Sequence, residues 1–314
     1  MYVEPNTSSL RQRGYVAYRQ FTDVVILERV QRQVGDSATQ RRWRDVLWKV
    51  RNGEAGRAEW ELLKTRAPQR VDMDASWNEA PRLWFNRKKV HEYNMTKLRA
   101  LRHRVVKIEA THTGGSMAKT ASEDVAHGLP AVLYLAVGAE VFLTWNLWAN
   151  ARLVNGTRGV VQDFVFDDDH LPPSLPLAVI VNFPDYAGPP FFEEYPTYVP
   201  ISVQYAEWRH RTSVLSRTQI PLRMCWAYTI YKSQGQTIEK AVIDLGDKEM
   251  MSGATYVALS RLRHLEDGVI AEFPLDHLKQ MKKQKRLKDR LEEEERLRSL
   301  ALIMLQSIED RLRP

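Results

Sequence analysis

The sequence predicts an α/β protein in which one parallel-sheet domain is interrupted by a small antiparallel β-barrel and followed by a charged C-terminal helix. Three observations predict this fold class. Strand and helix patterns alternate up to about residue 128, which is typical of a parallel sheet. Residues 129–215 contain strand patterns joined by Gly, Pro, Asn and Asp turns with no helical pattern between them, as in small barrels. From residue 216 the alternation returns.

The first part begins with a loose polar segment, residues 1–14, before the alternating patterns start. The β-branched run FTDVVILERV (21–30) predicts a strand. Apolar residues at helical spacing then predict a helix closed by Asn52-Gly53: Trp43, Val46, Leu47 and Val50. Further elements are expected in the order helix, strand, helix and strand at 58–68, 81–85, 86–102 and 104–112.

The later parts continue with short strands and one well-defined helix. The barrel strands are expected within 128–146, 156–166, 175–183 and 198–208. The resumed α/β pattern has strands within 220–230, at 241–246 and at 268–273, with a helix at 253–264. The tail from about residue 276 is helical by composition and has basic, acidic and apolar blocks. Such a tail packs on its own domain or pairs with a partner helix.

Composition excludes several classes of protein. With 44% hydrophobic and 27% charged residues, the 314-residue chain is globular and not disordered. Its formal net charge of +7 is weak support for a polyanion partner. The single cysteine, Cys225, excludes an intrachain disulfide and a multi-cysteine zinc site, and its apolar neighbours predict a buried, inert thiol. We find no signal peptide and no membrane-spanning run, so we expect a cytosolic or nuclear protein without membrane contact.

One segment imitates a phosphate-binding loop. THTGGSMAKT (111–120) ends in Lys-Thr, but Ala118 and Thr113 stand where the G-x-x-x-x-G-K-[ST] pattern requires glycine. We therefore predict a flexible loop. The run AVIDLG has one carboxylate, Asp244, which we expect to cap a turn instead of holding Mg²⁺. The sequence thus shows no Walker A lysine, no Walker B motif and no metal site.

Two other segments have the residue types that phosphate binding needs. In TIYKSQGQT, backbone amides after a strand can form an anion nest beside Lys232, although an ordinary turn has the same composition. In SGATYVALSRLRH, Tyr256, Leu259 and Leu262 form one helical face that predicts a core position. Arg261 lies beside this face, where it either projects toward a transferred phosphoryl group or is a plain surface arginine.

The order of the segments resembles the C-terminal half of superfamily 1B DNA helicases of the petite-integration-frequency (Pif) type, a group that includes Helitron-like helicases. The resemblance spans about residues 15–275. It rests on VILERVQRQ, PRLWFNRKKVHEYN, LPAVLYLAVGAEVFLTWNLWANARLVNGTRGVV, QIPLRMCWAYTIYKSQGQT and ATYVALSRLRHLEDGVIAEF, which follow one another in family order. It implies a second RecA-like helicase domain at 15–128 and 216–275, an SH3-like insertion at 129–215 and a helical tail at 276–314.

The resemblance also implies roles for individual residues. Arg32 and Arg261 correspond to the catalytic arginines that reach the γ-phosphate, and Gly235 and Gln236 border the same ATP cleft. Several residues correspond to the side that faces single-stranded or forked DNA: Asn86, Thr229, Tyr231, Lys232, Ser233 and Gln234. Trp145 and Trp148 could stack on bases, but burial in the barrel core is the favoured interpretation.

The chain departs from the family in two ways. Tyr231 stands where the family usually has histidine, which removes an imidazole but keeps a ring able to stack. The motifs that bind the β-phosphate and Mg²⁺ lie in an N-terminal RecA-like domain that this sequence does not include. We therefore expect ATP and Mg²⁺ to bind only when that domain is supplied, and we expect no ATP hydrolysis by this chain alone.

The resemblance leaves function and location open in several respects. One reading is the C-terminal portion of an ATP-dependent, five-prime-to-three-prime DNA helicase. The alternative is a non-catalytic nucleic-acid-binding module left from a truncated or decayed transposon helicase. The family implies a nuclear address, or a mitochondrial one, and links to DNA repair, recombination and telomere maintenance.

Overall fold

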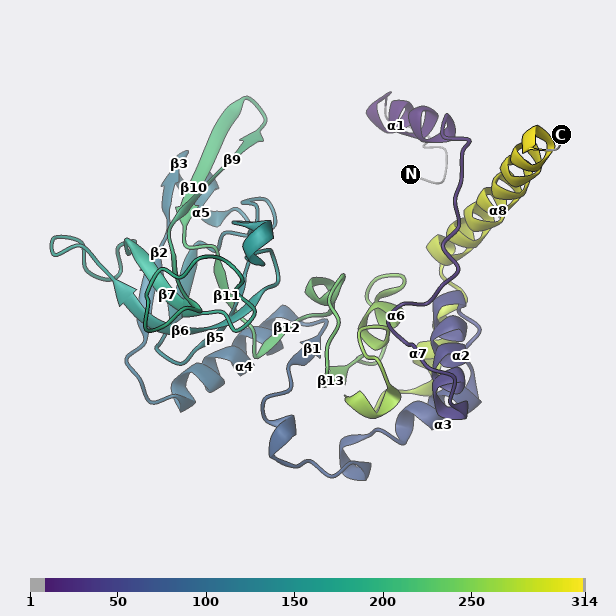
Figure 1. The fold of residues 1–314 in the computed structure, drawn as a ribbon, viewed down its shortest axis with the longest axis horizontal. Helices are drawn as coiled ribbons and strands as arrows, with labels where there is room; N and C mark the ends of the chain where they lie inside the picture. The colour runs from purple at the N-terminus through teal and green to yellow at the C-terminus, as the bar shows by residue number, and fades with distance from the viewer. Residues whose placement is uncertain (1–8, 313–314) are drawn as a thin grey trace. The chain divides into compact units, whose positions relative to one another are not determined.

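A mixed α/β fold with one parallel sheet and several antiparallel sheets is found in the computed structural model, which describes residues 9–312 (Figure 1). This confirms the predicted α/β class. The chain divides into two compact units, which we call unit 1 (residues up to 85 and from 229) and unit 2 (residues 86–228). Each unit is described by itself.

Unit 1 is built on short parallel strands covered by helices. β1 (Arg82–Trp84) pairs with β13 (Ala241–Asp244), which pairs with β14 (Gly268–Ile270). These are the predicted runs PRLWF, AVIDLG and GVIAEF, and their central residues Leu83, Ile243 and Val269 are fully buried. The helices around them are α2 (Ala38–Asn52), α3 (Arg57–Lys64), α6 (Ala254–Leu259) and α7 (Leu275–Met281).

The sequence signals for α2 and β13 are confirmed in detail. The Ser37 hydroxyl accepts a hydrogen bond from the Gln40 backbone N–H at 3.1 Å, which caps the start of α2. Gly53 ends the helix in the left-handed conformation, with φ +69°. The four apolar residues of the predicted face, Trp43, Val46, Leu47 and Val50, are buried. Asp244 caps a turn as expected, because its Oδ1 accepts from the Gly246 N–H at 2.9 Å.

Two predictions for the N-terminal part are wrong. Residues 21–30 form no strand in the structure, and Leu27 is 91% exposed and Val25 78% exposed. A strand needs a partner for its backbone, and β-branched side chains alone do not supply one. Of the predicted loose segment, residues 1–8 lie outside the described part, whereas α1 (Ser9–Arg19) is helical.

Unit 2 contains α4 (Arg87–Ala100), α5 (Gly115–Thr120) and three antiparallel sheets, in the orders β11-β5-β6-β7-β8, β3-β10-β9 and β2-β4. A single apolar core includes Leu135, Val161, Val181, Ile201 and Leu222. The described pairings run from β11 to β8 without closing into a ring. The strands are β2 (Val106–Glu109), β3 (Thr111–Thr113), β4 (Val132–Leu135), β5 (Glu140–Leu143), β6 (Arg158–Val165), β7 (Ala178–Asn182), β8 (Tyr198–Ile201), β9 (Gln204–His210), β10 (Ser213–Gln219) and β11 (Leu222–Met224). The division between the units falls within β12 (Ala227–Thr229).

The predicted flexible loop at 111–120 is instead strand β3 followed by helix α5. Buried Arg217 holds this segment: its Nη2 donates to the carbonyls of Ala118 and Ala121, both at 2.8 Å, and its Nη1 to Leu129 O at 2.8 Å. A partner about a hundred residues away therefore orders a stretch whose local sequence predicts a loop.

Two tryptophans expected in the barrel core are not buried. Trp148 is 41% exposed, and Trp145 is half-buried with its Nε1 donating to His127 O at 2.7 Å. Cys225, in contrast, is fully buried as predicted, and burial raises the pKa of its thiol to about 12. An inert thiol is the consequence.

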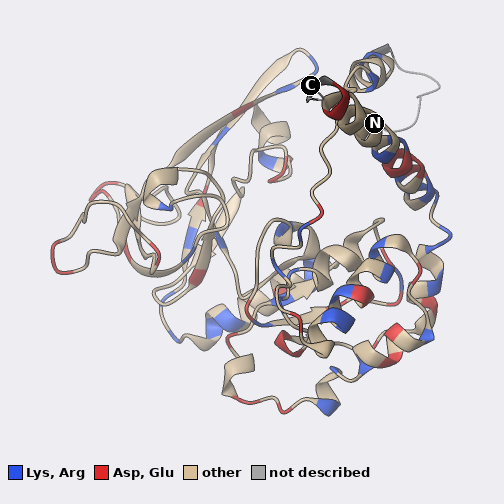
Figure 2. Ribbon diagram, turned by 45° about the vertical axis from the view of Figure 1, so that its right-hand side comes forward, with Lys and Arg blue, Asp and Glu red and all other residues tan. Residues whose placement is uncertain are grey.

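The C-terminal region consists of α7 and the long helix α8 (Lys285–Leu312). Figure 2 shows that α8 passes from basic to acidic residues and then to an uncharged stretch near its end. Its first half packs on unit 1 through buried Leu287 and through the Arg51–Glu294 ion pair, with N···O 2.6 Å. Among the described residues, no helix is both long enough and apolar enough to cross a membrane.

Candidate functional site

Two arginines that are far apart in the sequence meet in unit 1 at Ser260. Arg32 precedes α2, and its Nη1 donates to Ser260 O at 2.8 Å while its Nε donates to Thr237 Oγ1 at 2.9 Å. Arg261 follows Ser260 directly, and its Nη2 donates to the Ser260 hydroxyl at 2.8 Å. The structure therefore brings together both arginines that the sequence singled out. We call Arg32, Ser260 and Arg261 the arginine cluster.

Arg261 is held along the last turn of α6 and does not project from it. Its side chain donates to Val257 O at 2.8 Å and to Gln236 O at 3.3 Å, and the residue is only 7% exposed. Burial, followed by the positive charge of Arg32, lowers the pKa of Arg261 to about 10. Arg261 is still charged at neutral pH, so a bound anion would relieve its repulsion by the Arg32 guanidinium.

Gln33 fixes the backbone next to Arg32. It is buried at 5% exposure, and its Nε2 donates to Ser260 O at 3.2 Å and to Leu262 O at 2.7 Å. Arg44 Nη1 in turn donates to Gln33 O at 2.8 Å. Sequence reasoning gave Gln33 no role. The only signal was its place directly after Arg32.

The predicted cleft residues Gly235 and Gln236 lie beside Arg261. Gly235 has φ +87°, and a Cβ added there would meet nothing within 4 Å, so glycine is needed for the backbone conformation and not for space. The carbonyl of Gln236 accepts from Arg261, and the N–H of Ile238 donates to Arg261 O at 3.1 Å. The turn and the arginine are thus tied together through both backbones.

Apart from Asn86, the residues predicted to face DNA lie on the same turn, at 229–234, but differ in accessibility. Ser233 is fully buried, and its hydroxyl donates to Ile230 O at 2.6 Å, so its side chain points inward. Lys232 and Gln234 are exposed, and Thr229 is half-buried at the end of β12. The ring of half-buried Tyr231 lies 6.2 Å from the ring of Phe85.

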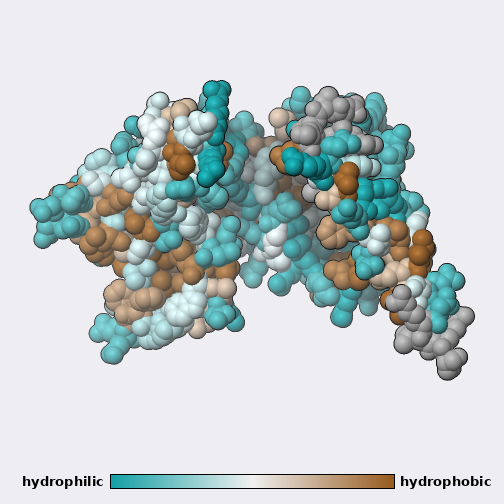
Figure 3. Space-filling view, turned by 90° about the horizontal axis from the view of Figure 1, so that it is seen from above, coloured by the Kyte–Doolittle hydropathy of each residue, from teal (hydrophilic) through white to brown (hydrophobic). Residues whose placement is uncertain are grey.

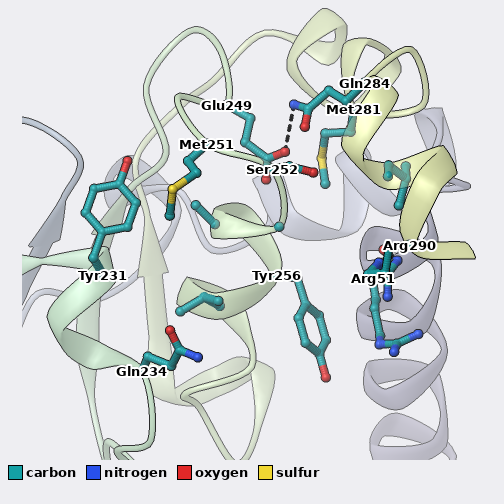
Figure 4. Close-up of a pocket in the computed structure, with 14 residues that line it drawn as sticks. Arg51, Tyr231, Gln234, Glu249, Met251, Ser252, Tyr256, Met281, Gln284 and Arg290 are labelled. Carbon is teal, nitrogen blue, oxygen red and sulfur yellow. Dashed lines mark hydrogen bonds between the residues drawn. The ribbon is translucent and has the colours of Figure 1, made fainter. Parts of the chain in front are cut away.

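A cavity of about 420 Å³ lies next to this turn, and Figure 4 shows the side chains around it. Tyr231 and Gln234 line one side, Met251 and Tyr256 come from the loop before α6 and from α6, and Arg51 and Arg290 lie opposite. Glu249 secures the loop, because its Oε1 accepts from the Thr255 N–H at 2.8 Å and its Oε2 from Gln284 Nε2 at 2.9 Å. Sequence reasoning missed this wall of the cavity.

Asn86 lies in unit 2, where it caps the N-terminus of α4. Its Oδ1 accepts from the Lys88 N–H at 2.8 Å and from the Lys89 N–H at 3.4 Å. The carboxamide oxygen is therefore engaged by the helix itself. Within residues 9–312, no group of three or more His, Cys, Asp or Glu side chains could hold a metal ion.

The chain resembles known proteins over most of its length, although no family model matches it. The human ATP-dependent DNA helicase PIF1 is 31% identical over 231 residues, which cover 73% of this chain. The Pif1 helicase of Candida albicans superposes with a TM-score of 0.63 at 26% identity, covering 86% of this chain and 60% of that protein. A Bacteroides Pif1 helicase solved with ADP-AlF3 and single-stranded DNA has the same fold, with a TM-score of 0.57 at 21% identity and coverage of 88% of this chain and 62% of that protein.

Each match covers most of this chain but only part of the related protein. The matched region covers only 32% of the human relative. The chain thus spans about a third of the length of the human relative and 60% of the Candida albicans protein.

Proposed function

We propose that this chain, which belongs to the Pif1-type helicase family, is the C-terminal portion of such a helicase. In that role it supplies two arginines to an ATP site and binds single-stranded DNA. The observation that carries the proposal is the meeting of Arg32 and Arg261 at Ser260, with donor–acceptor distances of 2.8 Å to its carbonyl and to its hydroxyl. Two guanidinium groups held close together bind the terminal phosphate of a polyphosphate better than they bind a neutral ligand.

The chain's part in ATP hydrolysis is electrostatic. Bound ATP supplies the transferred phosphoryl group, and charge that develops on its oxygens is stabilised by guanidinium groups already held in place. Thr237 and Gln236 accept hydrogen bonds from the two arginines, and Gln33 donates to the Ser260 carbonyl that Arg32 also contacts, so little reorganisation is needed when the anion arrives. A Walker-containing domain must provide the remaining phosphate and Mg²⁺ contacts.

The DNA-facing role falls to the turn that carries Tyr231, Lys232 and Gln234. A positive charge and an aromatic ring are the two groups that bind a single strand without sequence preference. Because Gly235 and Gln236 connect this turn directly to Arg261, movement of the nucleotide site is transmitted to the DNA contact. Ser233 acts through the turn's geometry, since its hydroxyl is bonded to Ile230.

Finer assignments follow from family membership. We propose that the antiparallel strands within residues 129–215 are the SH3-like insertion of the family, and that Asn86 lies near a phosphate of the DNA backbone. A nuclear or mitochondrial location and roles in repair, recombination or telomere maintenance belong to the same proposal.

The test is an ATPase assay of a fusion in which the Walker-containing domain of human PIF1 precedes the full chain. We expect DNA-stimulated hydrolysis that Arg261→Ala abolishes, and no hydrolysis by the chain without the added domain. In parallel, fluorescence anisotropy measures binding of the chain to labelled oligo-dT at two salt concentrations, with weaker binding expected at high salt. Arg261-dependent hydrolysis by the chain alone contradicts the proposal, as does a fusion whose hydrolysis is unchanged by Arg261→Ala.

A further inference from the structure

The last turns of α8 expose a block of apolar side chains. Leu302 is 67% exposed, Ile303 66%, Leu305 53% and Ile308 42%. In Figure 3, hydrophobic residues reach the surface close to the C-terminal end of the chain, where α8 lies. Leu302 and Leu305 lie on one side of the helix, and exposed apolar residues grouped in this way mark a surface that another molecule covers.

One stripe of this region has a pattern that fits a second copy of itself. Arg298, Leu302, Leu305 and Glu309 follow one another at spacings of four, three and four, which places them along one seam of an α-helix. All four residues are exposed. Read from either end, the seam shows a charge, two leucines and the opposite charge. Two such seams that run in opposite directions therefore place each leucine against a leucine and each charge against the opposite charge.

We propose that this seam of α8 pairs antiparallel with the same seam of a second copy of the chain. The two-fold axis passes between residues 303 and 304. Leu302 then faces Leu305 of the second copy, and Arg298 faces Glu309 of the second copy, so each contact occurs twice, as an isologous interface requires. A parallel arrangement would instead place arginine against arginine and glutamate against glutamate, and charge therefore selects the antiparallel one.

The charges of the seam favour a second copy over other partners. Helices that lie on anionic membranes surround their apolar face with Lys and Arg, whereas Glu309 and Asp310 directly follow this apolar block. Arg298 has a loose surface ion pair, 3.7 Å from Glu295, in which both side chains are at least half exposed. Breaking the Arg298–Glu295 ion pair therefore costs little free energy when Arg298 instead pairs with Glu309 of the second copy.

The interface is short, and we expect a weak dimer. Residues 298–309 span roughly 16 Å of helix, and the overlap buries two leucine pairs and forms two ion pairs. An interface of this size predicts a dissociation constant of about a micromolar or more, so the dimer forms only at protein concentrations in that range. The first half of α8 is anchored to unit 1 by Glu293 and Glu294, so the helix is already formed when two copies meet.

Sedimentation velocity of the full chain without DNA tests the pairing. We expect a monomer–dimer equilibrium whose dimer fraction rises with protein concentration. Leu305→Lys should leave a monomer. Ile303→Lys is the matched control, because Ile303 is equally apolar and exposed but points about 130° away from the seam on the same helix. It should leave the equilibrium unchanged.

A charge-reversal series tests the register. Arg298→Glu and Glu309→Arg should each weaken the dimer about tenfold or more, and the variant with both changes should restore it. Circular dichroism confirms that each variant keeps its helix content. A monomeric wild-type chain, a dimer that survives Leu305→Lys, or a double reversal as weak as the single ones overturns the proposal. None of these residues belongs to the arginine cluster or to the turn at 229–236, so the result is independent of the ATPase assay.

Discussion

Two buried arginines, one in each unit, are used in opposite ways. Arg217 in unit 2 is fully buried, and its guanidinium donates to the carbonyls of Ala118, Ala121 and Leu129 at 2.8 Å each. Arg261 in unit 1 is 7% exposed and also donates to carbonyls, but a second guanidinium, that of Arg32, acts on it. The exposed fraction of an arginine therefore does not by itself indicate whether its guanidinium stabilises the fold or binds a ligand.

The difference lies in the neighbouring charge. Burial lowers the pKa of Arg217, while the charge of Glu123 raises it, so its surroundings partly balance its charge. The pKa of Arg261 is lowered by burial and then by the like charge of Arg32, and the opposing influence of Tyr256 is smaller. The hydrogen bonds of Arg217 stabilise the fold, and the contrast supports the proposal that Arg261 is placed for an anion.

The largest expected effect is on hydrolysis. In the fusion with a Walker-containing domain, Arg32→Ala and Arg261→Ala should each lower kcat by about a thousandfold, the range for arginines that stabilise the phosphoryl group. Because both act on one charge, the double variant should be little worse than either single one. Steady-state ATPase assays measure all three. Multiplicative losses would show that the two arginines act independently.

The contrasting effect is on stability. Arg217→Met leaves at least three carbonyls without their donor and should lower the free energy of unfolding by about 3 kcal/mol or more. Arg261→Met removes a repelled charge together with its hydrogen bonds, so we expect a loss of about 1 kcal/mol or less. Urea unfolding followed by tryptophan fluorescence compares them. If both variants lose the same stability, the distinction between the two arginines fails.

A smaller effect is expected at the turn that joins the DNA side to Arg261. Gly235 has φ +87°, a conformation that alanine adopts at a cost of about 1 kcal/mol. Gly235→Ala should lower stability by that amount and weaken DNA-stimulated hydrolysis in the fusion. Gly235→Asn serves as the control, since asparagine tolerates the left-handed region better. Equal losses for both variants would mean that the side chain, and not the backbone, causes the defect.

The smallest effect is a pH dependence near α6. His277 is buried between Thr255 Oγ1, at 2.8 Å from Nε2, and Gly246 O, at 3.1 Å from Nδ1, and burial lowers its pKa although Gly246, Glu249 and Asp247 act in the opposite direction. The unfolded chain therefore binds the proton more readily, so the contribution of His277 is complete above about pH 6.5 and is lost as the pH falls toward the folded-state pKa.

The measurement is urea unfolding of wild type, His277→Gln and the exposed-site control His210→Gln between about pH 7.5 and pH 5.5. We expect a loss of less than about 1 kcal/mol in wild type that is smaller in His277→Gln and unchanged in His210→Gln. A wild-type profile identical to that of His277→Gln would contradict this interpretation.

Local patterns in the sequence predicted much of unit 1. Ser37 and Gly53 mark the ends of α2, and the three runs of the parallel sheet are apolar because both faces are covered. Residues 21–30 have a similar composition but no pairing partner, so the same pattern does not give a strand there. Similarly, the ordering of 111–120 depends on Arg217, which the local sequence does not include.

The candidate site could be predicted only in part. Arg32 and Arg261 were found from motif order, but their bridge through Ser260 joins residues 228 apart. Gln33 and Thr237 have no local feature that separates them from ordinary surface residues, and their roles follow from contacts made by folding. The inward direction of Ser233 likewise depends on its hydrogen bond to Ile230.

The most direct test of the arginine cluster is the affinity of the fusion for ADP with aluminium fluoride, compared with ADP alone, by isothermal titration calorimetry. Aluminium fluoride imitates the transferred phosphoryl group. Arg261→Ala should weaken binding of the ADP–aluminium fluoride complex by about a hundredfold or more and leave ADP binding within about threefold. Equal changes in both affinities, or no change in either, would contradict the assignment of Arg261 to the γ-phosphate.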